Sequence, residues 1–197
     1  MKFIKFVILL FVVFYSCSNR KTNELEMFPA YKLIKTFSKR IRPETDLVLY
    51  CYGVNYGLPK DYQYKNSVAN FTTDYKLYKT QKDTISREHA RELIVSLAES
   101  LLQEINSNPE VRPDLEVYPF TNELLSVTIY FIDENEIELG TGISSVHFRN
   151  GKLKYEHYEI YEYTGRYPAN GNHYKVHEET YVEALDIVQK QGALVYF

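Results

Sequence analysis

The stretch I-S-S-V-H-F-R-N-G-K-L-K-Y, residues 143–155, decides the fold of this chain. Asn150-Gly151 is the pair most typical of a two-residue β-hairpin turn, and a type I′ turn there fixes the register of the strands on either side. One face of the predicted hairpin is apolar and comprises Val146, Phe148, Leu153 and Tyr155. The other face is polar and comprises His147, Arg149, Lys152 and Lys154. This alternation predicts an antiparallel sheet with one buried face and one face in water.

A long amphipathic helix is predicted over residues 87–106, before the hairpin. Its apolar side chains recur every three or four residues, at Ala90, Leu93, Ile94, Leu97, Ala98, Leu101, Leu102 and Ile105. Arg91 is expected to point away from this stripe, and Ser86 is the expected N-cap. A stripe of this width predicts a helix that covers one face of a sheet.

Shorter helices are predicted near both ends of the chain. Residues 28–41 have the helical spacing of apolar side chains, and Pro43 is expected to end that helix. Thr180 and Glu183 form a capping box at the start of a last helix, which is expected to end at Gly192.

Three more strands complete the predicted sheet. Residues 47–54 are mostly apolar and indicate a buried strand, whereas residues 68–78 alternate as a half-solvated antiparallel strand does. Residues 127–132 give a further strand after a proline-punctuated linker. Because strands occur in runs, we expect an α+β fold: an antiparallel sheet of about five strands, with a long amphipathic helix and shorter terminal helices packed mainly on one face. Residues 27–197 are predicted to form one such domain.

Several segments of the chain carry a family resemblance. They are A-R-E-L at residues 90–93, I-N-S-N-P-E-V-R-P at 105–113, Y-P-F-T at 118–121, G-K at 151–152 and E-T-Y-V-E-A-L at 179–185. They resemble a family of uncharacterised exported proteins and lipoproteins of chlamydia-like and other host-associated intracellular bacteria. The resemblance covers roughly residues 47–190 and implies one α+β domain in an exported or envelope location. It implies no activity and no catalytic residue.

The first residues predict an export signal. A short basic start, an apolar run over residues 6–15 and the small residue Ser16 follow the order of a bacterial secretory signal. Cys17 comes directly after, as in lipoproteins, so we expect residues 1–16 to be removed and Cys17 to be lipidated. An ordinary cleaved signal or an uncleaved membrane anchor is the alternative, although the apolar run is short for a bilayer span.

The predicted lipid anchor indicates where in the cell the protein is located. Residues 17–26 form a predicted polar tether, and Ser18 is typical of lipoproteins sent to the outer membrane. We therefore expect a protein of the bacterial cell envelope, held to the outer membrane by its lipid. Lys and Arg dominate residues 17–42, where they either face anionic lipid headgroups or form the solvated side of a helix.

The charge of the chain argues against a nucleic-acid partner, and its cysteines argue against an intramolecular disulfide. The net charge is −3, and acidic residues dominate the chain beyond residue 42. Affinity for nucleic acid depends on neutralising phosphates, so an acidic main domain argues against a nucleic-acid partner. The chain has two cysteines. Once Cys17 is lipidated, Cys51 has no partner for a disulfide, and its apolar neighbours predict a buried, unreactive thiol.

No pattern typical of a catalytic or metal site stands out in the sequence. His173 and His177 are spaced as zinc ligands would be on a helix, but we expect extended chain there and find no third ligand. Ser144 and Ser145 lie within a predicted strand, without the turn that a nucleophile needs. Asp133 belongs to a group of acidic residues that indicates a solvated turn. We therefore expect no cofactor and no metal.

Tyrosine is abundant, since the chain has 19 Tyr and no Trp. Tyr56, Tyr62 and Tyr64 fall in a predicted loop and form the candidate contact surface for a protein or glycan partner. The sequence thus favours a lipid-anchored envelope protein that binds rather than catalyses. Two other classes stay open: a periplasmic or secreted hydrolase whose site is assembled from distant residues, and an inhibitor or effector that acts on a host or rival protein.

Overall fold

The computed structural model describes residues 28–56, 67–80, 82–164 and 167–197. In chain order the elements are α2 (Pro29–Thr45), β1 (Val48–Tyr56), β2 (Val68–Tyr78), α3 (Arg87–Ser107), the 3-10 turns η1 (Arg112–Asp114) and η2 (Asn122–Leu124), β3 (Leu125–Ile132), β4 (Ser145–Arg149), β5 (Lys152–Thr164), β6 (Tyr167–Thr180) and α4 (Tyr181–Lys190). The predicted signal and tether, Cys17, Tyr62 and Tyr64 lie outside the described residues. None of the described helices has both the length and the apolar composition that a bilayer crossing requires.

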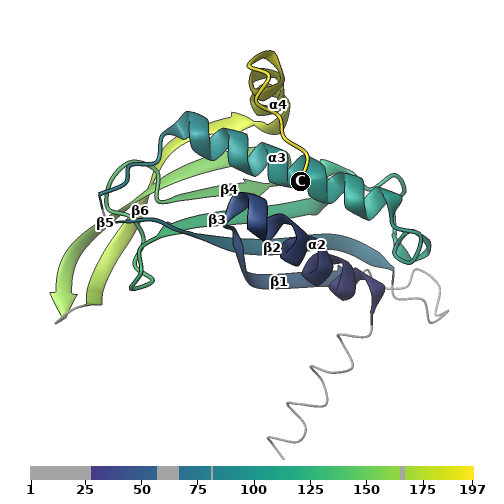
Figure 1. Ribbon diagram of the computed structural model, residues 1–197, viewed down its shortest axis with the longest axis horizontal. Helices are drawn as coiled ribbons and strands as arrows, with labels where there is room; N and C mark the ends of the chain where they lie inside the picture. The colour runs from purple at the N-terminus through teal and green to yellow at the C-terminus, as the bar shows by residue number, and fades with distance from the viewer. Residues whose placement is uncertain (1–27, 57–66, 81, 165–166) are drawn as a thin grey trace, which may run out of the picture.

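The strands form one six-stranded sheet in the order β1-β2-β3-β4-β5-β6. The described helices lie on one side of it, with α3 along the middle strands, α2 beside β1 and α4 against α3 (Figure 1). The predicted α+β fold with a long helix over the sheet is confirmed. The other side of the sheet carries no described helix.

The pairing of β2 with β3 is parallel, from Phe71 opposite Leu125 to Tyr78 opposite Ile132. The other neighbouring pairs are antiparallel. The prediction of a wholly antiparallel sheet is therefore wrong at this pair. Two parallel neighbours need a crossover connection because the chain must return to the same end of the sheet, and α3 with its flanking loops provides that crossover.

The sheet has a sixth strand, β6, where the sequence indicated only extended chain. It pairs with β5 in a long antiparallel hairpin that reaches past the rest of the sheet (Figure 1). The pairing shifts register between Tyr155 and Glu156 and again near Glu162. Such bulges break the two-residue alternation by which a strand is identified in a sequence. The predicted number of about five strands is one too low for this reason.

The hairpin at Asn150 and Gly151 has the predicted register, with Phe148 opposite Leu153. Both turn residues have a positive φ, of 51° and 69°, as a type I′ turn requires. The predicted apolar face is buried and comprises Val146, Phe148, Leu153 and Tyr155. Tyr181, at the start of α4, stacks on Phe148 with ring centroids 4.5 Å apart. The hairpin therefore provides two strands of the sheet, β4 and β5, and a surface on which α4 packs.

α2 buries the predicted stripe but ends later than predicted. Its buried apolar residues are Ala30, Leu33, Ile34, Phe37 and Ile41. The helix continues through Pro43 to Thr45 and stops at Asp46, which has a φ of 59°. Pro43 and Lys39, the residue one turn before it, are both exposed, so water can reach the carbonyl that loses its backbone donor. The prediction that Pro43 ends the helix is wrong, because the helix continues for two residues beyond it.

The predicted helix caps are confirmed. The Ser86 hydroxyl accepts a hydrogen bond from the backbone N–H of His89 at 3.1 Å. Thr180 and Glu183 form both bonds of a capping box. Gly192 follows α4 with a φ of 66°, a conformation that glycine adopts without strain.

β1 is less buried than predicted. It forms an edge of the sheet, and its pairing with β2 shifts between Leu49 and Cys51. This bulge leaves two consecutive side chains outside the core: Tyr50 is 61% exposed, and Cys51 is an exposed free thiol. The prediction of a buried thiol is wrong because the apolar run lies on an edge strand whose alternation is broken.

Candidate functional site

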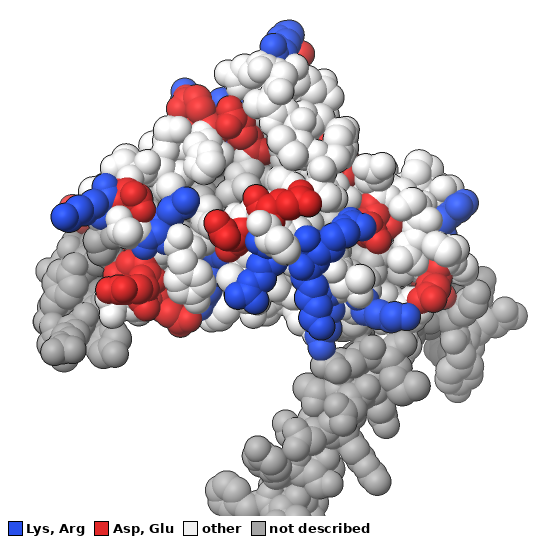
Figure 2. Space-filling model, in the orientation of Figure 1, with Lys and Arg blue, Asp and Glu red and all other residues white. Residues whose placement is uncertain are grey.

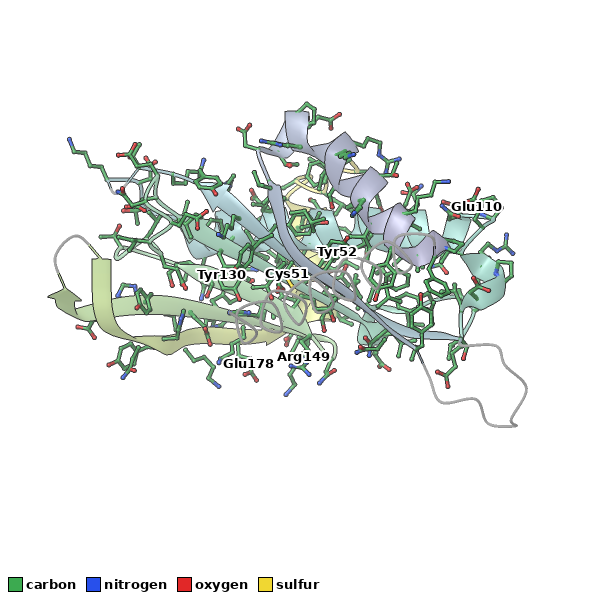
Figure 3. The ribbon with its side chains drawn as sticks, turned by 90° about the horizontal axis from the view of Figure 1, so that it is seen from below. Cys51, Tyr52, Glu110, Tyr130, Arg149 and Glu178 are labelled. Atoms are coloured by element: carbon green, nitrogen blue, oxygen red, sulfur yellow. The ribbon has the colours of Figure 1, made fainter. Side chains whose placement is uncertain are left out.

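The face of the sheet away from the helices is polar, and we call it the open face. Side chains of β2 and β3 alternate between the buried core and this face. Its outward side chains include Thr72, Asp74, Ser126, Thr128, Tyr130, His147, Arg149, Lys154 and Glu156. Figure 3 views the molecule from below, with Tyr130 and Arg149 labelled on this face.

The open face has hollows between its side chains. The first hollow has a volume of about 560 Å³ and is lined by Asn55, Asn70, Thr72, Asp74, Glu123, Leu124, Ser126, Thr128, Tyr130, His147, Phe148, Arg149 and Asn150. A second hollow, of about 600 Å³, is lined by His147, Arg149, Asn150, Lys152, Lys154, Glu156 and Glu178. His147, Arg149 and Asn150 belong to both linings, so the end of β4 forms the border between the two hollows.

Two histidines and two carboxylates meet on this face, and we call them the His–Glu cluster: His147, Glu156, His173 and Glu138. Glu156 Oε2 lies 3.2 Å from His147 Nε2 and 3.4 Å from His173 Nδ1. The other ring nitrogen of His173 lies 3.5 Å from Glu138 Oε1. Lys154 forms an ion pair with the second oxygen of Glu156. The side chains are partly shielded from water, from 11% exposed at Glu156 to 39% at His173.

His147 connects three strands through both of its ring nitrogens. Nδ1 lies 3.3 Å from the hydroxyl of Thr128 on β3. Nε2 contacts Glu156 on β5 and also lies 3.1 Å from the hydroxyl of Ser145 on β4. The ring of Tyr130 packs edge-on against the imidazole, with centroids 6.0 Å apart. These contacts fix the orientation of His147 at the border of the hollows.

Glu138 comes from the connection between β3 and β4, and a buried acid shapes that connection. The carboxylate of Asp133 accepts hydrogen bonds from the backbone N–H groups of Asn135 at 2.9 Å and Ile137 at 2.8 Å. Asp133 is 3% exposed, so the prediction of a solvated acidic turn is wrong at this residue. Its side chain is inside because it satisfies two backbone donors that the tight turn would leave unpaired.

The two carboxylates of the His–Glu cluster have opposite environments. Burial raises the pKa of Glu138 above its ordinary value, and the adjacent His173 opposes that rise. Burial acts in the same direction on Glu156, but its neighbours outweigh burial and hold the pKa of Glu156 below its ordinary value; they are Lys154, His147 and His173. Burial also lowers the pKa of His147, although Glu156 opposes this. Near neutral pH the cluster therefore favours an ionised Glu156 beside a neutral His147.

The His–Glu cluster lacks the geometry of a serine nucleophile. A Ser–His–acid triad needs the serine on one imidazole nitrogen and the acid on the other. Here Ser145 and Glu156 both approach Nε2 of His147, and Ser145 is fully buried. The two carboxylates cannot flank a substrate either, because His173 fills the space between them. Within the described residues, no three His, Cys, Asp or Glu side chains are grouped so as to hold a metal ion.

A second charged cluster lies on the helix side of the sheet, and we call Arg91, Tyr155 and Glu179 the inner cluster. Arg91 donates two parallel hydrogen bonds to Glu179, at 2.8 and 3.1 Å, and the Tyr155 hydroxyl donates to the same carboxylate. Burial, together with this contact to Glu179, raises the pKa of Tyr155. The prediction that Arg91 points away from the buried stripe is wrong. Arg91 is 5% exposed because its guanidinium meets a bidentate carboxylate there.

Tyr56 is the predicted contact residue that the structure describes, and it packs on the helix side. Its ring centroid lies 5.7 Å from that of Phe28, which precedes α2. Burial raises the pKa of Tyr56 to about 12. Its hydroxyl is buried without a hydrogen-bond partner among the described residues. The contact surface of Tyr56, Tyr62 and Tyr64 stays a prediction, since the last two lie outside the described residues.

Part of the open-face site is visible in the sequence. The hairpin pattern predicts that His147 and Lys154 lie opposite each other on the open face, as observed. The same register, extended by two residues on each strand, would also have placed Glu156 beside His147. The approach of His173 and Glu138 depends on the register of β6 and on a tight turn, for which the sequence gives no local signal.

The lining of the first hollow offers hydroxyl, amide, imidazole, carboxylate and guanidinium groups, and polar atoms outweigh apolar atoms on its surface. Such a lining suits a ligand rich in hydrogen-bonding groups rather than an apolar one. No protein-family model, no curated protein and no solved structure matches the chain.

Proposed function

We propose that this protein is held in the bacterial envelope by a lipid on Cys17 and binds a glycan on its open face. The secretory pattern of residues 1–16 and the cysteine that follows support the anchor. The resemblance to exported lipoproteins supports the same location in the cell envelope. α2 lies close in sequence to the predicted tether, and Figure 2 displays Lys and Arg side chains gathered over it. A cationic helix beside a lipid anchor favours contact with anionic headgroups.

The observation that carries the glycan proposal is the polar first hollow on a face without a described helix. Sugar hydroxyls both donate and accept hydrogen bonds, so a sugar site needs closely spaced side chains of both kinds. In the first hollow the carboxylates of Asp74 and Glu123 can accept, and the guanidinium of Arg149 can donate. The hydroxyls of Thr72 and Thr128 can do both. This mixture matches a polyhydroxylated ligand.

A protein partner fits the first hollow less well. Protein interfaces have an apolar centre, in which aromatic side chains contribute most of the binding energy. The exposed large apolar side chains of the described chain include Tyr50, Tyr174, Val176 and Val182, and none of the full set lines the first hollow. Tyr130 contributes one half-buried aromatic ring, which suits contact with a single sugar ring.

Binding also fits the site better than hydrolysis. The groups that would do acid–base chemistry are bonded to one another: Glu156 contacts both imidazoles, and His173 contacts both carboxylates. A general acid or base must reach the substrate proton directly or through one water. The bonds within the His–Glu cluster therefore hold its side chains in fixed positions beside the site.

A glycan array probed with the purified protein tests the ligand class. We expect the wild-type protein to be retained on a subset of oligosaccharides. Thr128→Val keeps the side-chain shape but removes a hydroxyl from the first hollow, so it should reduce retention strongly. Val182→Ala, an exposed position on α4, is the matched control and should bind as the wild type does. Retention of Thr128→Val at the wild-type level, or no retention of any protein, would contradict the proposal.

Cell fractionation tests the anchor. Cys17→Ala should release the protein from the membrane fraction or block processing of the signal, because the acylated thiol is gone. Cys51→Ala, which changes the other cysteine, should leave the protein in the membrane fraction. Unchanged membrane retention and unchanged mass of Cys17→Ala would rule out the lipid.

A further inference from the structure

The β4–β5 hairpin places like charges opposite each other on the open face. Arg149 lies opposite Lys152 at the end of the hairpin. Like charges directly opposite in a strand pair destabilise the pairing. A hairpin that keeps a cationic end beside a hollow therefore carries a local electrostatic penalty, and a bound anion would relieve it.

Neighbouring acids neutralise both lysines but leave the arginine. Lys152 lies 3.6 Å from Glu178, and Lys154 pairs with Glu156. Arg149 is exposed and has no ion pair or hydrogen bond from its side chain to any part of the described chain. Its guanidinium is the charge of this hairpin end that an external group can still neutralise.

The position of Arg149 also favours the binding of an anion. It lines both the first and the second hollow, and Figure 3 shows it near Glu178 at the rim of the open face. A guanidinium presents a planar fork of donors that matches a carboxylate or a phosphate. Asn150, the next residue, lines both hollows as well and supplies an amide beside that fork.

We infer that the ligand of the open face carries an anionic group, a carboxylate or a phosphate, which Arg149 binds. This inference rests on the proposed glycan-binding function and narrows the ligand to an acidic sugar. The sugar ring would lie in the first hollow, against Thr128 and Tyr130. The anion would lie at the border of the two hollows, because Arg149 and Asn150 line both of them.

The side-chain Nε–H resonance of Arg149, observed by NMR, tests the inference on the purified protein. The probes are glucuronate, its neutral analogue glucuronamide and inorganic phosphate. We expect glucuronate to bind at least about tenfold more tightly than glucuronamide, because only the acid makes a charge-assisted pair with the guanidinium. Arg149→Gln should reduce glucuronate binding to the level of glucuronamide. Lys190→Gln, on α4, is the control and should change nothing.

The other outcomes separate this inference from the glycan proposal. Equal binding of glucuronate and glucuronamide would overturn the anionic subsite and leave glycan binding in place. A shift by phosphate but not by glucuronate would support the subsite and assign it to a phosphorylated sugar. Binding to phosphatidylglycerol vesicles that Arg149→Gln abolishes would overturn the inference in favour of a lipid surface. No shift by any probe would overturn it as well.

Discussion

The inner cluster and the His–Glu cluster lie on opposite faces of the same strands, and consecutive residues of β5 supply them. Tyr155 joins the inner cluster, and Glu156 joins the His–Glu cluster. The inner cluster is closed, since the side chains of Arg91 and Glu179 are only 6% and 8% exposed and bond to each other twice. In the His–Glu cluster, the side chains of His147 and His173 are 28% and 39% exposed.

This difference separates a structural role from a binding role. A buried bidentate pair has few donors and acceptors left for a ligand, and here it joins α3 to the C-terminal end of β6. The open face, in contrast, keeps donors that a ligand can use, such as the guanidinium of Arg149 beside both hollows. Substitutions on the two faces should therefore affect different measurements: unfolding for the inner cluster and ligand affinity for the open face.

Glu179→Gln should cause the largest loss of stability. It leaves the buried Arg91 charge without its ionic partner, and breaking a buried pair from one side costs roughly 3–5 kcal/mol. Urea unfolding followed by circular dichroism measures the loss. Glu178→Gln is the matched control, because this adjacent acid forms only exposed ion pairs, with Lys152 and Lys175, and should leave the unfolding free energy nearly unchanged. Equal losses in the two variants would show that the inner cluster has no special role.

Phe148→Ala and His147→Ala compare the two faces at consecutive residues. Phe148 is 1% exposed, and its truncation should cost roughly 3–5 kcal/mol, at the lower end because Tyr181 can relax into part of the cavity. His147→Ala removes polar contacts on the open face and should cost about 1 kcal/mol. The same unfolding experiment measures both. A larger loss for His147→Ala would mean that the open face, rather than the core, holds the sheet together.

The two carboxylates that contact His173 should respond to pH with opposite signs. The pKa of Glu138 is raised in the folded protein, so ionisation above its ordinary value of 4.5 is penalised by folding. Glu138→Gln should then stabilise the protein near neutral pH and have no such effect near pH 3, where the carboxyl is protonated in both states. The pKa of Glu156 is lowered, so its contribution is present above 4.5 and is lost as the pH falls through the folded value.

Glu156→Gln should therefore destabilise the protein near neutral pH, and its difference from the wild type should shrink in acid. Urea unfolding of both variants at several pH values measures the two effects, which are smaller than those of the core substitutions. Effects of the same sign at neutral pH would contradict the opposite environments of the two carboxylates.

The features predicted from the sequence depend on neighbours along the chain. The register at Asn150 and Gly151 is set by two turn residues, and the stripes of α2 and α3 by helical spacing. The parallel pairing of β2 with β3 was not predicted, because no local sequence pattern shows which earlier strand pairs with the strand that follows a crossover. The exposed Cys51 was missed because a bulge on an edge strand leaves no sign in an apolar run.

The candidate site was predicted only where it lies within the hairpin. His147 and Arg149 were placed on the wet face by alternation, and the structure agrees. His173 joins them through β6, whose register with β5 shifts three times. Arg91 looked like a solvated helix residue, since its partner Glu179 is distant in sequence and on another element. Long-range pairing of this kind is decided by packing rather than by local pattern.

Glycan binding by the open face is the central proposal for this protein. Backbone amide NMR, with an oligosaccharide that the array retains, tests this directly because it locates the contact on the molecule. We predict chemical-shift changes confined to the open face, at Thr72, Thr128, His147 and Arg149, with the amides of α4 unmoved. Changes confined to the helix side of the sheet, or the absence of any retained oligosaccharide, would contradict the account.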